Sequence, residues 1–536
     1  MNLRRLALTG TFAFHVVSLV TTTNSNSFGF GIAPPLQAFR NSARKSLPPI
    51  RFQNSDNADD SSFVVETTEL ASPPSTWKSA LSQNEDFLKC VDELFPSNEK
   101  KEAEIGGQEL YFLFVGPYHA DNFANIVKEA SRRVDGTLIS ILGGGVIGQG
   151  VEVEGETTPS LSILGGILPE GARIHATTIE DPKDLNSIQQ KHQNDDSSSP
   201  RGVSPSYMIW SDPQATMLDQ VLQSLEGRVV VGGVTVPPTK ASNQPSIAIN
   251  DAILSPGSIL SLECSGTFGL SSIVTQGCQP IAEKESSDFF VVTEVVGGAI
   301  AKLNDTSAIE QLEKTVSMAS KEIQDLVREN GVLGGILDLS SSPSLSHSSD
   351  FVIHQVIGYR PQSGSILMSG SVKEGDIFQF HVKSAESAQA DFRGIIRRAQ
   401  TERLVLGTKS LGDLVGAVQV SSIARGEELY GKPNIDVQFI NSLFEGTADA
   451  CPSGKSDSAP IAGCFTSGEL GSAGIHMGSS SQSSSSFPST SKTHLFGCTT
   501  VAILLCDHSR TSSRRMEEDH VILDAEHVPT LEDAWG

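Results

Sequence analysis

The apolar and polar positions between residues 109 and 142 predict a strand, a helix and a second strand. The run ELYFLFVG, residues 109–116, is apolar and of strand length. Apolar side chains then recur at helical spacing, with Asp121 before them as a candidate N-cap; they are Phe123, Ile126, Val127, Ala130 and Val134. Residues 138–142 form the next apolar run. This order is typical of an α/β domain.

Glycines follow the second apolar run, in the segment GGGVIGQGVEVEG. Gly143, Gly145 and Gly148 have the G-x-G-x-x-G spacing of a dinucleotide-binding fingerprint. In such a site the third glycine opens a helix whose N-terminus meets the pyrophosphate. Here Gly148 is followed by alternating apolar and polar residues and by Pro159, a pattern typical of strands. We therefore expect the glycines to let strands pack closely, or to expose backbone N–H groups to a small ligand.

The later segments predict more strands and two more helices. Asp212 and Pro213 are placed to start a short helix with Met217 and Leu218 on its apolar face. A long helix is expected over residues 306–327, with Thr306 or Ser307 as its cap. Strands are expected in the segments 228–233, 245–251, 257–266, 270–281 and 288–305.

Composition and charge exclude some functions. The 536 residues are enough for two or three domains with a sizeable core. A net charge of −24 argues against a nucleic-acid binder, because phosphate recognition needs clustered Lys and Arg. The first 55 residues contain no Asp or Glu but six basic residues: Arg4, Arg5, Arg40, Arg44, Lys45 and Arg51.

This basic first segment has the pattern of a targeting sequence. Two arginines precede an apolar stretch, residues 6–20, that is too short to span a bilayer, as in a signal peptide. Residues 27–52 are basic and free of acids, which is typical of transit peptides. The combination resembles the bipartite presequence of complex plastids in diatoms and related algae. We expect a signal peptide at residues 1–27, a transit peptide and disordered linker at 28–75, no membrane span in the mature chain and a plastid location, with the secretory pathway or the cytoplasm as alternatives.

The cysteines favour a reducing compartment. They show no C-x-x-C pairing and no histidine at zinc spacing, and their number is odd; they are Cys90, Cys264, Cys278, Cys451, Cys464, Cys498 and Cys506. Such a scattered set argues against a disulfide scaffold. We expect neither a metal nor a cofactor.

Several blocks, in order, resemble the FIST domain, which is found in bacterial signalling proteins and in a eukaryotic F-box protein. The blocks of the first half are GGGVIGQGVEVEG, VVVGG, VTQGCQPI and VVTEVVGGAIAKLND. Those of the second half include GAVQVSSIARGEELYG, PIAGCFTSGELG and LFGCTTVAILL. The chain departs from the family at Ser422, where Cys is frequent, and at Phe496, where His is frequent. Serine-rich insertions interrupt it at residues 197–206, 340–349 and 479–491.

The resemblance implies a mixed α/β (α+β) fold of two consecutive sheet-and-helix lobes packed together. The implied parts are a FIST N-terminal domain at residues 76–298, a FIST C-terminal domain at 299–508 and an acidic tail at 509–536. The implied function is that of a sensory protein that binds a small ligand and has no catalytic residues. The chain shows no attached kinase, methyl-acceptor or cyclase segment, so its output would pass through a protein partner.

Residues in these blocks are candidates for ligand binding: Gly145, Gly233, Gly277, Cys278, Arg425, Gly468 and Glu469. Glu469 follows an apolar strand, where it either faces a pocket and accepts from an ammonium or amide group, or faces solvent. Arg425 either binds a ligand carboxylate bidentately or pairs with Glu427, Glu428 or Glu469. Together Arg425 and Glu469 would suit a zwitterion such as an amino acid. Cys278 would be a nucleophile only with a base beside it, and a structural role is favoured.

A second hypothesis is a protein-interaction scaffold or ubiquitin-ligase adaptor, by analogy with the F-box relative. Residues 77–96 lack the leucine-rich pattern of an F-box, and a plastid location would separate the protein from cytosolic ubiquitin ligases. A cysteine hydrolase built on Cys278 is a third and less favoured hypothesis.

Overall fold

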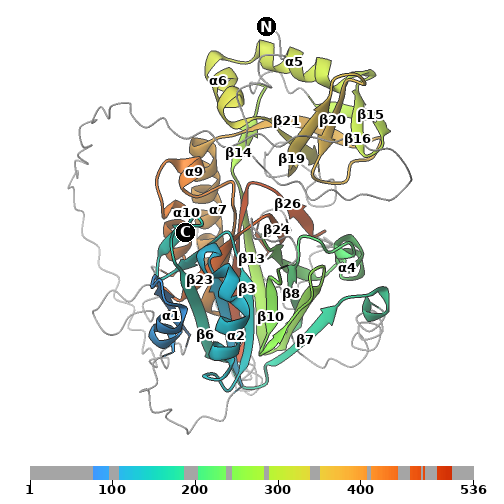
Figure 1. Cartoon of the computed structure of the whole chain (residues 1–536). Coiled ribbons are helices and arrows are strands. Elements are labelled where there is room, and N and C mark those ends of the chain that lie inside the picture. The colour runs from blue at the N-terminus through green and yellow to red at the C-terminus, as the bar shows by residue number, and fades with distance from the viewer. Residues whose placement is uncertain are drawn as a thin grey trace, which may run out of the picture. The chain divides into compact units, whose positions relative to one another are not determined.

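The structure is a computed structural model that describes residues 77–95, 108–185, 203–236, 244–282, 289–337, 351–406, 412–444, 459–472, 475–476 and 492–509. These residues belong to one structural unit and form four sheets with helices packed on them (Figure 1). The predicted presequence, the serine-rich insertions at 340–349 and 479–491, and residues 510–536 of the acidic tail lie outside the described residues. The mixed α/β fold class is confirmed.

The predicted strand–helix–strand start is confirmed. β2 (Glu109–Val115) and β3 (Thr137–Leu142) are parallel neighbours in a six-stranded sheet. α2 (Phe123–Ser131) connects them and buries the predicted apolar face up to Ala130. The predicted cap was wrong: a 3-10 turn, η2 (Pro117–Asn122), contains Asp121, and the N-cap position falls at Asn122. The sheet is completed by β1 (Lys78–Ser82), β6 (Leu161–Ile167), β10 (Ile247–Ile249) and β11 (Ala252–Ile253), and α1 (Phe87–Leu94) packs on α2 and β1.

The glycine-rich segment forms a hairpin, and no helix begins at Gly148. β4 (Gly145–Gly148) pairs antiparallel with β5 (Val151–Glu154). Gln149 and Gly150 make the turn with φ of 50° and 76°, the left-handed values that a tight hairpin requires. The expectation of strands in place of a dinucleotide fingerprint is therefore confirmed.

Two further sheets combine strands from both predicted lobes. A six-stranded sheet contains β26 (His494–Phe496), β24 (Gly468–Gly471), β9 (Val229–Val234), β8 (Val203–Ser211), β12 (Ile259–Gly266) and β7 (Arg173–Ile179), in that order. A seven-stranded sheet contains β25 (Ile475–His476), β13 (Phe268–Gln276), β27 (Thr499–Asp507), β22 (Asp413–Ser422), β23 (Ile461–Thr466), β4 and β5. The two lobes thus share their sheets.

The fourth sheet has eight strands. They are β14 (Cys278–Pro280), β21 (Ile377–Lys383), β15 (Phe290–Val296), β16 (Ala299–Leu303), β17 (Thr306–Ser307), β20 (Ser365–Met368), β19 (Phe351–Arg360) and β18 (Leu333–Leu337). Two helices, α5 (Ala308–Met318) and α6 (Lys321–Asn330), share a hydrophobic core with it.

Two helix predictions were wrong in extent. The single long helix is α5 followed by α6, because Ala319 is extended and the hydroxyl of Ser320 accepts from the Ile323 N–H at 3.4 Å to cap α6. The short helix, α4 (Leu218–Ser224), begins after Met217 and not at Asp212. The Asp212 carboxylate instead holds two loops, as described below.

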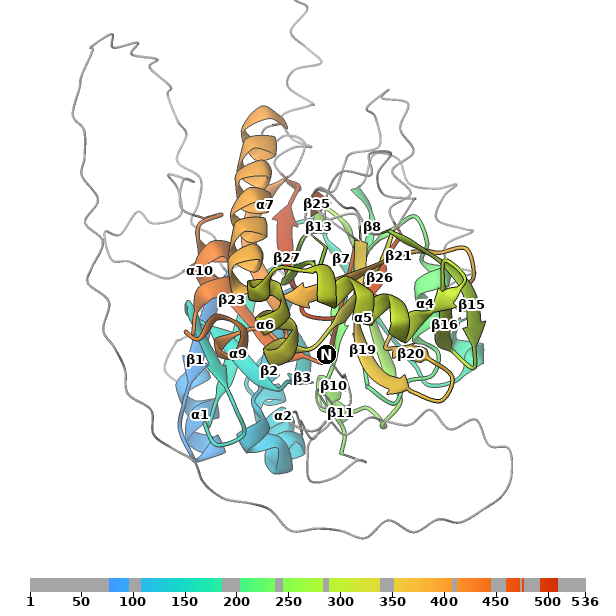
Figure 2. The same ribbon diagram turned by 90° about the horizontal axis from the view of Figure 1, so that it is seen from above.

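Helices cover one face of the seven-stranded sheet. α7 (Ala385–Leu406) packs against β13, and α10 (Ile435–Asn441) lies beside α7 (Figures 1 and 2). Phe392, Ile395, Val437 and Ile440 bury their side chains there against the sheet residue Ala502. A short helix, α9 (Glu427–Tyr430), precedes α10. Within the described residues, no helix has the length and apolarity needed to cross a membrane.

Candidate functional site

The carboxyl ends of three strands bring the candidate blocks together. β22 and β23 are parallel neighbours, and β27 is antiparallel to both β22 and β13, so β13, β22 and β23 run in the same direction. Their carboxyl ends lead into Gly277–Cys278, into Arg425 and into Gly468–Glu469. In open α/β sheets, ligands bind outside the carboxyl ends of the strands. We call this region the carboxyl-end site.

Arg425 lies inside this site with none of its surface exposed. Its Nε donates to Asp436 Oδ2 at 2.8 Å, and its Nη2 donates to Asp436 Oδ1 at 2.9 Å. Nη2 also donates to the Tyr430 hydroxyl at 2.5 Å. The sequence suggested Glu427, Glu428 or Glu469 as partners, whereas the observed carboxylate is that of Asp436 on α10.

Asp436 is held by hydroxyl groups as well as by Arg425. Tyr430 donates to Oδ1 at 2.6 Å, and Thr500 donates to Oδ2 at 2.6 Å. Burial by itself would raise the pKa of Asp436, but the Arg425 guanidinium and these hydrogen bonds outweigh it and hold the pKa below its usual value. The pair is therefore ionised at neutral pH.

Gly277 lets the backbone pass close to the third guanidinium nitrogen. Among the described residues, Arg425 Nη1 makes one hydrogen bond, of 3.4 Å, to the Thr275 carbonyl. A Cβ on Gly277 would lie 3.1 Å from this Nη1 and 2.9 Å from the Cys498 carbonyl oxygen. Any side chain at Gly277 would therefore crowd both groups.

The Cys278 thiol is buried beside Cys498. Burial is the main cause that raises the pKa of both thiols. They pack with Ala424 and with Leu333, Phe351 and Ile353 of the eight-stranded sheet. This apolar contact joins the eight-stranded sheet to the carboxyl-end site.

Glu469 is fully buried, so it does not face solvent. It lies on β24, opposite Gly233 on one side and Phe496 on the other. Thr466 donates to its Oε1 at 3.0 Å, while its Oε2 has no hydrogen-bond partner among the described residues. Burial raises the pKa of Glu469 well above its usual value, against opposing contributions from Thr466, the Thr499 N–H and Arg425. Burial therefore disfavours the ionised form of this carboxyl group.

The structure brings six of the seven predicted binding residues into neighbouring positions. Gly277 and Arg425 lie around Cys498, with Cys278 in the same apolar cluster. Gly233, Gly468 and Glu469 lie on adjacent strands, and the Thr499 N–H, next in the chain after Cys498, lies near enough to the Glu469 carboxyl group to lower its pKa. Gly145 is placed differently, in β4 opposite Glu154 and against the Phe465 ring.

Another buried carboxyl group that the sequence did not predict, Glu152, lies on β5. Glu152 Oε1 accepts from the Val437 N–H at 3.0 Å and from Gln419 Nε2 at 3.1 Å, and Oε2 has no partner in the described part of the chain. Burial, followed by the charge of Asp436, raises the pKa of Glu152 to about 7. The period-two alternation around Glu152 is the signal of a strand, but it does not tell which face another element covers.

Gln276 connects the site to the eight-stranded sheet by a hydrogen bond. Its Nε2 donates to the Phe351 carbonyl at 2.7 Å, and its Oε1 is buried without a partner in the described residues. Buried polar atoms without partners are rare in folded proteins and call for a water, an ion or a ligand. No group of three or more His, Cys, Asp or Glu side chains within the described ranges is placed to hold a metal ion.

Comparison with known proteins finds two domains of one family in this chain. The FIST N domain matches residues 109–306, and the FIST C domain matches residues 308–472. The chain belongs to the FIST family. The N domain contributes Gly233, Gly277 and Cys278 to the carboxyl-end site, and the C domain contributes Arg425, Gly468 and Glu469. The site therefore requires both FIST domains.

The FIST chain is also similar to mycobacterial proteins. It is 26% identical over 267 residues to an uncharacterized protein of Mycobacterium tuberculosis (strain ATCC 25618 / H37Rv). The aligned residues cover 50% of this chain and 62% of the relative. It is 26% identical over 259 residues to an uncharacterized protein of Mycobacterium bovis (strain ATCC BAA-935 / AF2122/97), 48% of this chain and 60% of the relative. The chain thus spans less than two thirds of the length of each relative.

Proposed function

We propose that this FIST protein is a sensory module that binds a small, amino-acid-like ligand at the carboxyl-end site and has no catalytic activity of its own. The observation that supports this most is the meeting of Gly277, Arg425 and Glu469, from separate blocks, at the carboxyl ends of parallel strands. Glu469 and Gln276 each keep a buried acceptor atom without a partner in the described residues. Such an atom costs about 1–3 kcal/mol, which a bound ligand would recover.

The proposed ligand uses the groups that the protein leaves incomplete. Asp436 occupies Nε and Nη2 of Arg425, so Nη1 is the nitrogen that would meet a ligand carboxylate. Glu469 Oε2 would accept from the ligand ammonium group, which would favour the ionised form of Glu469. Gly277 packs closely against this nitrogen, since a Cβ there would lie 3.1 Å from Nη1, so ligand entry would have to displace the Gly277 segment.

Ligand entry would change the contact between the site and the eight-stranded sheet. Arg425 and Glu469 are fully buried, and Phe351 and Ile353 pack over Cys278 and Cys498. We propose that binding separates this contact, because a sensor needs two states that a ligand distinguishes. A partner protein that recognises the separated state would carry the signal onward.

The absence of catalysis is supported by the state of the thiols. A cysteine nucleophile acts as the thiolate, which a lowered pKa favours. Burial instead raises the pKa of both Cys278 and Cys498. This arrangement suits packing and does not suit nucleophilic attack.

Thermal unfolding of the full chain with amino acids and related metabolites tests the proposal. A ligand should raise the melting temperature in a concentration-dependent manner. Glu469→Gln should remove this increase, whereas Glu226→Gln, a change of an exposed carboxylate, should retain it. If no compound raises the melting temperature and affinity capture recovers a ubiquitin-ligase subunit, the protein-interaction scaffold replaces the sensor.

We also propose that the protein resides in a plastid. The support is the acid-free, basic segment of residues 1–55. A fluorescent fusion of residues 1–60 should accumulate in plastids, and secretion or cytoplasmic fluorescence would contradict this location.

A further inference from the structure

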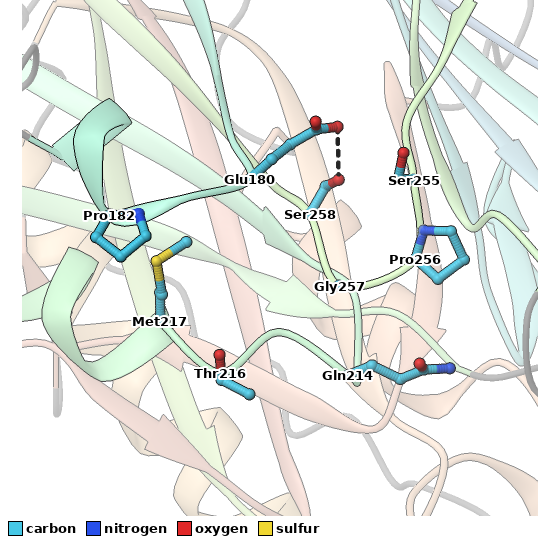
Figure 3. A pocket seen from close by; sticks show the side chains of 9 residues that line it. All are labelled: Glu180, Pro182, Gln214, Thr216, Met217, Ser255, Pro256, Gly257 and Ser258. Atoms are coloured by element: carbon cyan, nitrogen blue, oxygen red, sulfur yellow. Dashed lines mark hydrogen bonds between the residues drawn. The ribbon is translucent and has the colours of Figure 1, made fainter.

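A pocket of about 390 Å³ lies beside the end of β8 and shares no residue with the carboxyl-end site. Figure 3 shows three segments around it: the one after β7 with Glu180 and Pro182, the one before α4 with Gln214, Thr216 and Met217, and the turn Ser255–Ser258 before β12. This position follows the same rule as the carboxyl-end site, because β8 and β9 are parallel and the pocket lies past the carboxyl end of β8.

One buried carboxylate braces two of these segments. Asp212 directly follows β8 and is 5% exposed. Its Oδ1 accepts from the N–H groups of Gln214 and Gly257, both at 2.9 Å, and its Oδ2 accepts from the Ser246 hydroxyl at 2.8 Å. These donors are all neutral, and no cationic side chain pairs with Asp212 in the described part of the chain. A negative charge is therefore held next to the pocket without a local counter-charge.

The pocket lining adds a second carboxylate and no base. Glu180 Oε1 accepts from the Ser258 hydroxyl at 3.1 Å, which holds the Glu180 side chain beside the start of β12 on one wall of the pocket (Figure 3). None of the nine lining residues is Lys or Arg. Pro182, Met217 and Pro256 supply apolar surface. Charges of one sign beside low-dielectric walls raise the local concentration of the opposite ion.

We propose that this pocket binds a small organic ammonium ion, with its ammonium group at Glu180 and its alkyl chain against Pro182, Met217 and Pro256. The hydroxyl groups of Ser255 and Thr216 are further acceptors in the pocket lining. A ligand carboxylate finds no base in the lining and would approach both Glu180 and Asp212. The pocket therefore selects against acids and zwitterions, which distinguishes its ligand from that of the carboxyl-end site.

Calorimetric titration of the full chain tests this inference with three four-carbon probes. 1,4-Diaminobutane should bind, and binding should weaken as salt is added. 1,4-Butanediol, which has the same chain without charge, and butanedioate, which has the opposite charge, should give no binding. Equal binding of the diamine and the diol would overturn the proposal, and so would the absence of diamine binding.

The variant Glu180→Gln locates the binding. It keeps the shape of an exposed side chain and removes its charge, so the diamine affinity should fall about ten- to hundredfold. Glu226→Gln, on the exposed surface after α4, should retain the affinity, and equal melting temperatures would show that both variants fold. If Glu180→Gln binds the diamine unchanged, or if Glu469→Gln abolishes binding in its place, the proposal is overturned. A failure to bind amino acids would count against the carboxyl-end proposal and leave this one intact.

Discussion

Arg425 and Asp436 form a bidentate ion pair from which solvent is excluded, with side chains that are 0% and 1% exposed. Removing two charges from water is costly, and their attraction offsets that cost only when the remaining hydrogen-bonding positions are filled. Tyr430 and Thr500 fill those of Asp436. The pair joins the loop after β22 to α10, so it fixes the geometry of the carboxyl-end site.

Replacing Asp436 by Asn should destabilise the protein by about 3–5 kcal/mol, because the buried Arg425 would lose the carboxylate with which it makes its bidentate pair. Equilibrium denaturation in urea measures the change. Asp325→Asn, which removes an exposed i,i+3 pair with Arg328, should cost less than about 1 kcal/mol. Equal effects of the two variants would show that the buried pair contributes no more than a surface one.

Much of the local structure could be predicted from the sequence. Strand β2, helix α2 and strand β3 follow directly from the periodicity of residues 109–142. The break between α5 and α6 could not be predicted, because Ala319 and Ser320 are compatible with a continuing helix and the Ser320 cap forms only when the chain turns there. The sequence also did not predict that two sheets contain strands of both lobes, because pairing between strands far apart in the chain leaves no local signal.

The candidate site was predicted as a set of residues but not as a set of contacts. Arg425 and Glu469 were identified by the blocks that contain them, and they do lie at one edge of a sheet. The partners Asp436 and Glu152 were missed, because each lies in an ordinary helical or alternating pattern. Asp436 and Glu152 join the hydrogen bonds of the carboxyl-end site only because α10 packs next to β5 and β22.

Glu152 should make stability depend on pH. Its pKa is raised from 4.5 to about 7 in the folded protein, so the folded state holds this proton more tightly than the unfolded state. The stabilisation from this group is therefore complete below pH 4.5 and is lost as the pH rises through about 7. The free energy of unfolding lost through the ionisation of Glu152 is at most about 3 kcal/mol.

The variant Glu152→Gln isolates this effect, because glutamine stays neutral and its carbonyl can accept the same hydrogen bonds. The free energy of unfolding of the variant, minus that of the natural protein, should increase between pH 4.5 and 7.5. Other titrations cancel in this difference. A difference that stays constant over that range would contradict the assignment.

Gly277 and Gly394 should respond oppositely to substitution by Ala. At Gly277 the new Cβ would lie 2.9 Å from the Cys498 carbonyl oxygen, so we expect a loss of about 1–3 kcal/mol. Gly394 lies inside α7, and a Cβ there would meet nothing within 4 Å. The same substitution there should stabilise the protein by up to about 1 kcal/mol, through helix propensity. Denaturant titration of both variants measures the two signs, and a neutral Gly277→Ala would show that the loop at Cys498 can move.

The thiol of Cys278 should be almost unreactive in the folded protein. It is buried and its pKa is raised, so an alkylating reagent should reach it only when the chain opens. Labelling of the native chain should be slower than labelling of the denatured chain by at least about a thousandfold, the scale of the unfolded fraction. Peptide-resolved mass spectrometry after timed exposure to a maleimide separates this thiol from the other cysteines.

The same measurement distinguishes a binding protein from a cysteine hydrolase. A hydrolase would require Cys278 to react in the native state. Its thiol would then need a pKa below that of a free thiol, because the thiolate is the form that reacts. Cys498, which packs in the same cluster and has a pKa raised by the same burial, is the internal control and should be protected equally. Rapid modification of Cys278 alone would therefore refute a purely structural role for this thiol, since packing by itself protects both.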